Sequence, residues 1–378
     1  MDFEFSEDQL ALQEAASDLL AARCTTERVR TVADTARHLD DDLWAAMAEQ
    51  GWPAVEVAED RGGLGLGLVE VAMLGEQLGR HLAPVPFLGT VLTLGALSGA
   101  LDRGALAPDA ALGGVPVGSW TERLAAGEAC GALAWPGRAG AVVAVPSDGG
   151  WRLTGRPDPV VYGAEADVVV TWATPSGAPS PHLFALGVPD PRPASQPAMD
   201  RTRSIGWLEL HDHPAVALGA EDAAAVLLDR AAAALSAEML GAASVVLDMT
   251  VAYAKDRVQF GRPIGGFQAV KHRCADMLVD VEGMRSATYY AAWAVGAGDP
   301  DASAAASAAK VWCSDAARRV MGSGLQVHGG IGFTWEHDLH LFLKRSQLDQ
   351  VSLGDAAFHR DRIAAILRPR AEAGQPVF

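Results

Sequence analysis

The stretch from Lys255 to Met277, KDRVQFGRPIGGFQAVKHRCADM, joins two long helical patterns through a short turn, and it constrains the fold more than any other segment. Residues 224–254 place apolar side chains at the spacing of one helix face, and residues 267–295 also have a helical pattern. Between them Gly261 and Pro263 interrupt the helix, and the proline suits the start of the next one. Helices joined by so short a turn run antiparallel, so the segment predicts a helical bundle.

The turn of this hairpin holds side chains that suit a nucleotide diphosphate: Arg257, Gln259, Phe260 and Gln268. The arginine is a planar cation for bidentate contact with phosphate, the glutamines supply two amides, and the phenylalanine offers an aromatic face. The same residues also fit an ordinary helical hairpin with solvated arginines. The turn alone does not separate these two interpretations.

A second motif, QVHGGIGF from Gln326 to Phe333, again follows a helical pattern. It places Gly329, Gly330 and Gly332 where the backbone must come close to another group. Neither motif is the dinucleotide fingerprint of a βαβ unit, because no strand precedes either one.

Together, RVQFGRPIGGFQ and QVHGGIGF at this separation resemble the acyl-CoA dehydrogenase family of flavoenzymes, and the resemblance covers essentially the whole chain. In that family the matching residues bind the adenine and pyrophosphate side of FAD from the neighbouring subunit, across a dimer interface. The resemblance therefore implies that the chain holds the nucleotide of an FAD whose ring lies mostly on another protomer. The implied FAD-binding residues are Arg257, Gln259, Phe260, Ile264, Phe267, Gln326, Gly329 and Gly330.

The patterns along the chain are helical, then β, then helical again. Residues 1–118 are mainly helical and open on a capping box formed by Ser6 and Gln9. Residues 119–219 contain short apolar runs separated by Pro, Gly, Ser and Asp, which is typical of a β-sandwich or barrel. Residues 220–378 are helical. The resemblance implies an α+β fold of the acyl-CoA dehydrogenase type, with a helical N-terminal domain, a middle β domain and a C-terminal four-helix bundle.

The composition sets limits on partners and location. A chain of 378 residues is long enough for two or three domains, and its formal charge of −17 argues against nucleic acid and anionic membranes as partners. A site for a polyanion must then be locally basic. No run of about 18 apolar residues lacks charge or glycine, and the start MDFEFSEDQ lacks the profile of a signal peptide. We therefore expect a cytoplasmic protein without a membrane span.

The cysteines show no metal-binding spacing: Cys24, Cys130, Cys274 and Cys313. Buried or free thiols in a reducing cytoplasm are the simpler interpretation. The segment WEHD, from Trp335 to Asp338, has the wrong spacing for a two-histidine site on a helix. We expect no metal.

The positions that the resemblance assigns to a catalytic base carry no carboxylate. Family members remove the α-proton of an acyl-CoA thioester while hydride passes to the flavin, and a positioned base contributes about 10²–10⁴ in rate. The two usual glutamate positions align with Leu353 and Ala231, and neither residue can accept a proton. The nearest spare carboxylates are those of Asp355, Glu238 and Asp229. Asp355 is a weak candidate for the base, because it equally suits a helix N-cap, and the other two suit paired or solvated helix positions.

The β region departs from the family pattern as well. Where the family has a threonine and a serine that support the flavin ring and the CoA arm, this chain has Ala134 and Gly140. Where a tryptophan and a hydroxyl donor cover the flavin ring, it has Pro159 and Val161. A flavin ring here would lose two or three hydrogen bonds, each contributing about 0.5–1.5 kcal/mol net.

The residues that act on a neighbour's FAD are thus kept, and those that act on the chain's own flavin and substrate are lost. This asymmetry resembles the acyl-CoA dehydrogenases that form α2β2 heterotetramers with two flavins and act on bulky substrates, notably steroid side-chain CoA thioesters. The resemblance implies a catalytic partner subunit, and it implies that the chain meets acyl-CoA only through the complex. It also allows an electron-transfer flavoprotein as acceptor. Two alternatives stay open: a self-sufficient homotetramer with a relocated base, and a non-catalytic assembly protein on the same scaffold.

Two further residues near the motifs have competing interpretations. His328, within QVHGG, could contact a phosphate or ribose, but a hydrogen-bonded structural histidine is the favoured interpretation. Arg262 could assist Arg257 electrostatically, but a solvated arginine is expected.

Overall fold

The computed structural model describes residues 4–138 and 140–376. Its contacts divide the chain into two compact units, each built from separate segments. The helical unit comprises the described part of Met1–Val29, with Leu68–Ala83 and Ala232–Phe378. The mixed unit comprises Arg30–Gly67 and Pro84–Ala231. The N-terminal helices are thus distributed over both units, and the three-part division along the sequence remains a prediction.

A six-stranded sheet forms the centre of the mixed unit, in the order β3-β7-β4-β5-β10-β8. Because β7 also pairs with β8, five of these strands close into a barrel. Its core is filled by small and branched side chains and by the ring of Phe184. The strands are β3 (Gly131–Ala134), β4 (Val142–Ser147), β5 (Gly150–Gly155), β7 (Val168–Pro175), β8 (His182–Gly187) and β10 (Leu210–Gly219). Two-residue strands pair outside this sheet: β1 (Ala111–Leu112) with β2 (Val115–Pro116), and β6 (Val160–Val161) with β9 (Ile205–Gly206).

Helix α5 (Phe87–Asp102) packs directly on strand β3 in the same unit. A Cβ atom on Gly89 would lie 2.6 Å from the carbonyl oxygen of Gly131, so the helix and the strand touch through their backbones. The hydroxyl of Thr90 accepts a hydrogen bond from the Gly131 N–H at 3.1 Å, which satisfies a buried donor at this contact. The other helices that lie within this unit are α3 (Asp41–Glu49) and α6 (Val117–Ala125), and α2 (Thr26–Ala33) runs from the helical unit into it.

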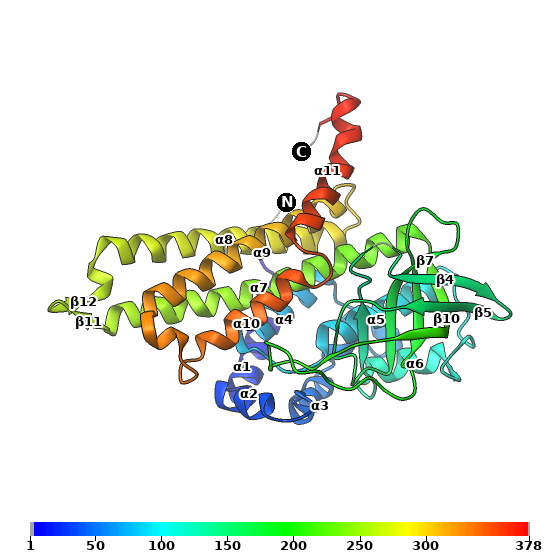
Figure 1. The fold of residues 1–378 in the computed structure, drawn as a ribbon, viewed down its shortest axis with the longest axis horizontal. Helices are drawn as coiled ribbons and strands as arrows, with labels where there is room; N and C mark the ends of the chain where they lie inside the picture. The colour runs from blue at the N-terminus through cyan, green and yellow to red at the C-terminus, as the bar shows by residue number, and fades with distance from the viewer. Residues whose placement is uncertain (1–3, 139, 377–378) are drawn as a thin grey trace. The chain divides into compact units, whose positions relative to one another are not determined.

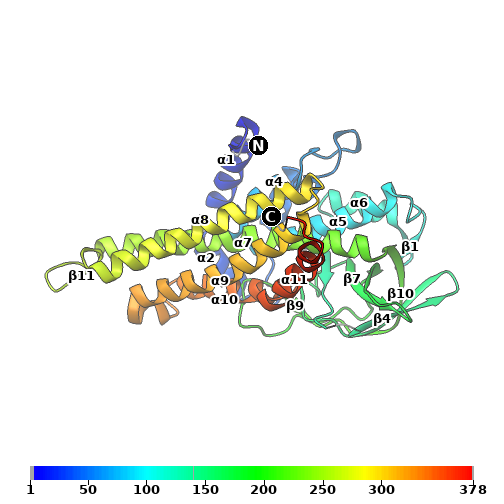
Figure 2. The ribbon, with the colours of Figure 1, turned by 90° about the horizontal axis from the view of Figure 1, so that it is seen from above.

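The helical unit is an antiparallel arrangement of long helices. In Figures 1 and 2 the C-terminal part of α7 and the helices α8 and α9 lie side by side, and the β11–β12 turn lies beyond the ends of α9 and α10. The helices are α1 (Glu7–Arg23), α4 (Leu68–His81), α7 (Glu221–Asp256, from Ala232 in this unit), α8 (Gln268–Gly296), α9 (Ala302–His328), α10 (Leu339–Val351) and α11 (Ala356–Glu372). The helical hairpin predicted around residues 255–277 is confirmed, and so is the helix–β–helix fold.

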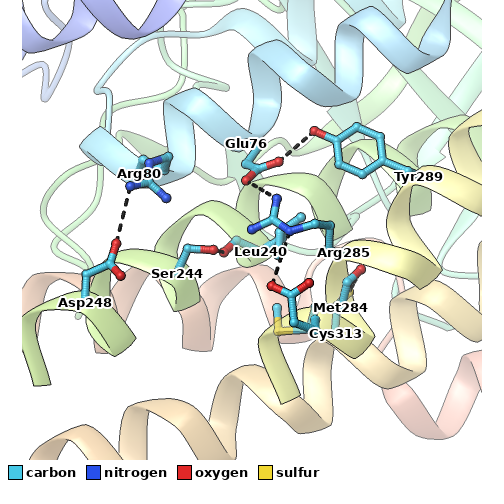
Figure 3. Close-up of polar contacts among 10 residues, drawn as sticks. Glu76, Arg80, Leu240, Ser244, Asp248, Met284, Arg285, Tyr289 and Cys313 are labelled. Carbon is cyan, nitrogen blue, oxygen red and sulfur yellow. Dashed lines mark hydrogen bonds and ion pairs between the residues drawn. The ribbon is translucent and has the colours of Figure 1, made fainter. Parts of the chain in front are cut away.

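Helix α4 crosses α7 with direct backbone contact. A Cβ atom on Gly79 would lie 2.0 Å from the carbonyl oxygen of Glu238, and one on Gly241 would lie 1.9 Å from that of Glu76. The buried carboxylate of Glu76 then reaches α8, where it accepts hydrogen bonds from Arg285 at 2.8 Å and from the Tyr289 hydroxyl at 2.6 Å (Figure 3). These contacts explain why α4 belongs to the same unit as the C-terminal helices.

Two local predictions about helix starts have different outcomes. The capping box is confirmed, because the Ser6 hydroxyl accepts from Gln9 N–H at 3.2 Å and the Gln9 side chain accepts from Ser6 N–H at 2.9 Å. The prediction that Pro263 starts the following helix is wrong. Pro263 precedes a 3-10 turn, Ile264–Gly266, and α8 begins only at Gln268. The reason is the pair of glycines in that turn, since Gly265 passes close to the carbonyl of Ala254.

Helix α7 is long and apolar enough, by length and composition, to cross a membrane. However, 83% of its most apolar window is buried inside the protein. That burial is typical of a core helix.

Candidate nucleotide site

The exposed tip of the α7–α8 hairpin carries the first motif. Strands β11 (Val258–Gln259) and β12 (Arg262–Pro263) pair there around a two-residue turn. Both turn residues, Phe260 and Gly261, have positive φ angles of 52° and 76°, as a type I′ hairpin requires. A left-handed backbone is unfavourable for an aromatic residue, by roughly 1–3 kcal/mol. Phe260 nevertheless occupies it and is 92% exposed, so the tip presents this ring to solvent.

Aromatic and cationic side chains pack against one another on this tip. The rings of Phe260 and Phe267 meet edge to face with centroids 6.0 Å apart. The guanidinium of Arg262 lies 4.1 Å above the centre of the Phe267 ring, at cation–π distance. Arg262 is exposed to solvent, as expected, and its guanidinium also stacks on this ring. Ile264 lies behind the tip, where its N–H donates to the Arg257 carbonyl at 2.8 Å and closes the turn.

The tip is locally basic in a chain of net charge −17. Residues 255–273 hold five lysines or arginines and a single aspartate. Within the described ranges, no carboxylate lies within ion-pair distance of the arginines of this segment, Arg257, Arg262 and Arg273. Arg273 donates instead to the Ser323 hydroxyl on α9 at 3.4 Å. The charges of this tip are thus available to an anion.

The second motif lies at the end of α9. Gln326 belongs to the last helical turn, and Gly329 to Phe333 form a 3-10 helix. Gly329 has φ 63° and ψ −140°, a conformation that favours glycine. A Cβ atom on Gly329 or on Gly330 would meet no other atom within 4 Å. Packing within this chain therefore does not explain Gly330, and both positions leave room for an outside group.

The structure brings the two motifs together through a ring contact. Tyr253, one turn before Arg257 on α7, stacks on His328 with ring centroids 4.6 Å apart and planes 24° apart. The Arg257 N–H donates to the Tyr253 carbonyl at 2.9 Å, and Gly329 directly follows His328. The histidine also hydrogen-bonds to the Gly324 carbonyl through Nδ1 at 2.8 Å, which confirms the structural interpretation of His328.

The turn between α10 and α11 contains Leu353 at the position where the family resemblance places the base. Leu353 is buried and has a φ angle of 56°. The ammonium of Lys310, fully buried on α9, donates to the carbonyls of Asp349, Gln350 and Gly354 at 3.0, 3.0 and 3.1 Å. This turn is therefore filled and closed by the protein itself.

Burial strongly perturbs the two titratable groups that hold this turn. It lowers the pKa of Lys310 to about 8, although Asp349 acts in the opposite direction. His359 donates from Nε2 to the Leu353 carbonyl at 3.2 Å, and its Nδ1 contacts the Ser307 hydroxyl at 3.3 Å. Burial lowers the pKa of His359 to about 4, and the charge of Lys310 acts in the same direction. Sequence reasoning missed both residues, and the signal for Lys310 was a lysine in the apolar, alanine-rich run ASAAASAAKVW.

Each of the three spare carboxylates has a partner within the chain. Asp355 caps α11, because its Oδ1 accepts from the Phe358 N–H at 2.8 Å, and the N-cap interpretation is confirmed. Glu238 is buried and pairs with Arg345 at 2.8 Å. Asp229 is buried and has a partner. Ala231 is fully buried and carries no functional group.

The mixed unit contains the four positions whose side chains support a flavin ring in the family. Ala134 is buried in β3, and its carbonyl accepts from the Thr171 hydroxyl at 2.8 Å. Pro159 directly precedes β6, and Val161 is part of it. An open cavity of about 460 Å³ nearby is lined by Arg138 and Arg156, with Asp158 and Trp207. The side chains of Ala134, Pro159 and Val161 offer no hydrogen bond to an isoalloxazine, and Gly140 has no side chain. These four positions therefore fit a flavin ring poorly, whereas the hairpin tip fits a nucleotide diphosphate.

Comparisons with known proteins agree with this architecture. Residues 6–104 match the acyl-CoA dehydrogenase N-terminal domain, and residues 219–367 match the acyl-CoA dehydrogenase C-terminal domain. The chain is 33% identical to acyl-CoA dehydrogenase IpdE2 of Mycolicibacterium smegmatis, over 92% of this chain and 95% of that protein.

Among solved structures, the chain superposes on a variant of the Tcur3481–Tcur3483 steroid ACAD with a TM-score of 0.86, at 30% identity over 97% of this chain and 99% of that one. It also superposes on the ChsE4–ChsE5 complex of Mycobacterium tuberculosis with a TM-score of 0.85, at 29% identity over the full length of both chains. With both terminal domains matched and a relative this similar over nearly its whole length, the chain belongs to the acyl-CoA dehydrogenase family.

Proposed function

We propose that this chain is the non-catalytic subunit of a heteromeric, flavin-dependent acyl-CoA dehydrogenase, and that it completes the FAD nucleotide site of a catalytic partner. The observation that carries this proposal is a contrast within the helical unit. The hairpin tip presents Arg257 and Arg262, which have no ion pair with any described residue, and the exposed ring of Phe260. The turn that would carry the base is filled by Leu353 and closed by Lys310.

The nucleotide part of the proposal rests on the chemistry of the tip. Arg257 would make charge-assisted hydrogen bonds to the diphosphate, and Gln259 and Gln326 would supply amides. Phe260 gives a ring face to the nucleotide, and Ile264 and Phe267 support the tip from behind. Gly329 and Gly330 let the backbone approach the ligand, since nothing in this chain fills the space above them.

The chemical step belongs to the partner in this proposal. A bound FAD would supply the hydride acceptor for the β-carbon of the acyl-CoA. The partner supplies the carboxylate that removes the α-proton, because Leu353 and Ala231 cannot accept one. This chain binds and orients the nucleotide.

The substrate and partner classes follow from the relatives. Two of the similar solved structures are heteromeric complexes, and one of them is described as a steroid ACAD. We propose a bulky, steroid-type acyl-CoA thioester as the substrate, a related acyl-CoA dehydrogenase chain as the partner and an electron-transfer flavoprotein as the acceptor, in the cytoplasm.

The test is the flavin absorbance per chain, measured on the chain alone and after co-expression with its partner. Alone, the chain is expected to be nearly colourless and without dehydrogenase activity. With the partner, one flavin per pair of unlike chains is expected. An isolated chain that is stoichiometrically yellow and active on an acyl-CoA would overturn the proposal. A partner whose flavin content and rate do not depend on this chain would point to an assembly protein.

A further inference from the structure

His328 lies within the second motif and stacks on Tyr253, one turn before the first motif, without itself being exposed. It is 3% exposed at the end of α9, directly before Gly329. We propose that His328 is a positioning residue of the nucleotide site, and that only its neutral form holds the Gly329–Gly330 turn in place. This inference rests on the proposed function, because it concerns how firmly the same site holds FAD.

The packing around His328 links the ends of two helices. Its ring stacks on Tyr253 of α7 and also meets the His337 ring edge to face, with centroids 4.6 Å apart. A Cβ atom on Gly324 would lie 2.8 Å from a methyl carbon of Val246, so α9 can approach α7 only because residue 324 is glycine. The Gly324 carbonyl is also the group that His328 binds. The position of Gly329 relative to Arg257 therefore depends on this imidazole.

The hydrogen bonds of His328 determine which protonation state fits. The Gly324 carbonyl can only accept, so Nδ1 must carry a hydrogen and donate to it at 2.8 Å. The other nitrogen, Nε2, is buried and has no hydrogen-bond partner among the described residues. In the neutral ring Nε2 is a bare acceptor. In the protonated ring it becomes a charged N–H with no acceptor, which is the more costly of the two states in a buried position.

The rings that face His328 are those of Tyr253 on α7 and His337 before α10. Among the described residues, no carboxylate acts on the pKa of His328. Burial lowers the pKa of His328, and His337 lowers it further, while the bond to Gly324 acts in the opposite direction. The histidine is therefore neutral near pH 7. At acid pH the ring takes up a proton on Nε2, which has no hydrogen-bond acceptor among the described residues.

The predicted consequence is a loss of FAD at acid pH that depends on this one residue. Above the usual histidine pKa of about 6.5, the turn is held and FAD affinity is constant. As the pH falls through the lowered pKa of His328, the affinity of the complex for FAD drops, by at most about tenfold per pH unit for a single linked proton.

The test compares the complex of the wild-type chain with that of His328→Asn. The asparagine amide can donate to the Gly324 carbonyl as Nδ1–H does, but it does not titrate. FAD dissociation constants are measured from pH 7.5 to pH 5.0. The wild-type complex is expected to lose affinity at the acid end, and the variant to keep a nearly constant affinity. The matched control is His211→Asn, at a histidine whose side chain is 82% exposed in the mixed unit, and it should follow the wild-type profile.

A second measurement separates the failure of this inference from the failure of the proposed function. Hydrogen exchange of the amides of residues 325–333, corrected for intrinsic rates, is followed in the isolated chain over the same pH range. Protection that falls on acidification in the wild type but not in His328→Asn supports the positioning role. Equal profiles in the two proteins overturn it. A complex that holds no FAD at any pH overturns the proposed function, whatever the exchange data show.

Discussion

Glu238 and Arg345 form an ion pair closed to solvent, with Oε1 and Nη1 2.8 Å apart and side chains 1% and 0% exposed. Glu238 lies on α7 and Arg345 on α10, and the guanidinium also reaches the Leu82 carbonyl after α4 at 3.4 Å. The pair thus ties three segments of the helical unit together. The carboxylate of Glu238, one of the candidate bases in the sequence, is therefore held in an ion pair.

Removal of the cation from this pair should be strongly destabilising. Arg345→Met leaves the Glu238 carboxylate buried without its counter-ion, and the free energy of unfolding should fall by about 3–5 kcal/mol. The double variant Glu238→Leu with Arg345→Met should recover most of the loss, because it removes the charge that has to be compensated. Urea unfolding of both variants measures this. An equally unstable double variant would show that packing, and not the stranded charge, is the source.

Arg257→Ala should weaken FAD retention by the complex. The substitution removes a charge-assisted contact to the diphosphate, which contributes roughly 1.5–3 kcal/mol. The corresponding loss of FAD affinity is about tenfold to a hundredfold. The matched control is Arg152→Ala, another exposed arginine, on strand β5. Flavin content per complex after gel filtration is the readout, and a result equal to the control would place the nucleotide elsewhere.

Substitutions of Asp355 distinguish the proposed function from that of a self-sufficient enzyme. Asp355→Asn keeps a good N-cap for α11 but removes the carboxylate, so turnover by the complex should stay within about twofold of the wild type. Asp355→Ala should lower stability by about 1 kcal/mol, again with turnover retained, because the bond to the Phe358 N–H is lost. Steady-state rates at saturating acyl-CoA decide the matter. Abolished turnover in Asp355→Asn, with FAD still bound, would identify a base within this chain.

Features encoded by neighbouring residues could be predicted from the sequence. The capping box of Ser6 and Gln9 spans three residues, and the hairpin of α7 and α8 follows from apolar spacing and from the breaking residues between them. The fold class follows from the change of pattern near residue 119 and again near residue 220. In each case the residues whose interactions decide the structure are close to one another in the sequence.

Features that depend on distant contacts could not be predicted in this way. Lys310 reads as an ordinary lysine on a helix, yet it binds carbonyls about forty residues away, at Asp349 and Gly354. Arg345 and Glu238 are 107 residues apart. The division into units has the same origin, because Gly79 and Gly241 allow α4 to join the C-terminal helices. A periodic pattern identifies an apolar face but does not say which helix covers it.

The site residues lie between these two cases. The resemblance supplied the FAD-binding set, and the structure shows Arg257, Gln259 and Phe260 on one exposed tip. The stack of Tyr253 on His328, which links that tip to the glycine turn, has no signal in either motif alone. Whether these residues bind FAD stays a prediction.

The buried His359 predicts how the stability of the chain depends on pH. Its pKa in the folded chain is about 4, against about 6.5 when unfolded, so the folded state disfavours the charged ring. Stability from this group is therefore complete above pH 6.5 and is lost as the pH falls towards 4, because only the unfolded chain takes up the proton. The loss amounts to at most about 3 kcal/mol. In His359→Gln, an amide can still donate to the Leu353 carbonyl but does not titrate, so unfolding in urea at pH 7 and pH 5 should differ less than in the wild type. Equal pH dependence in the two proteins would show that this imidazole is not the group responsible.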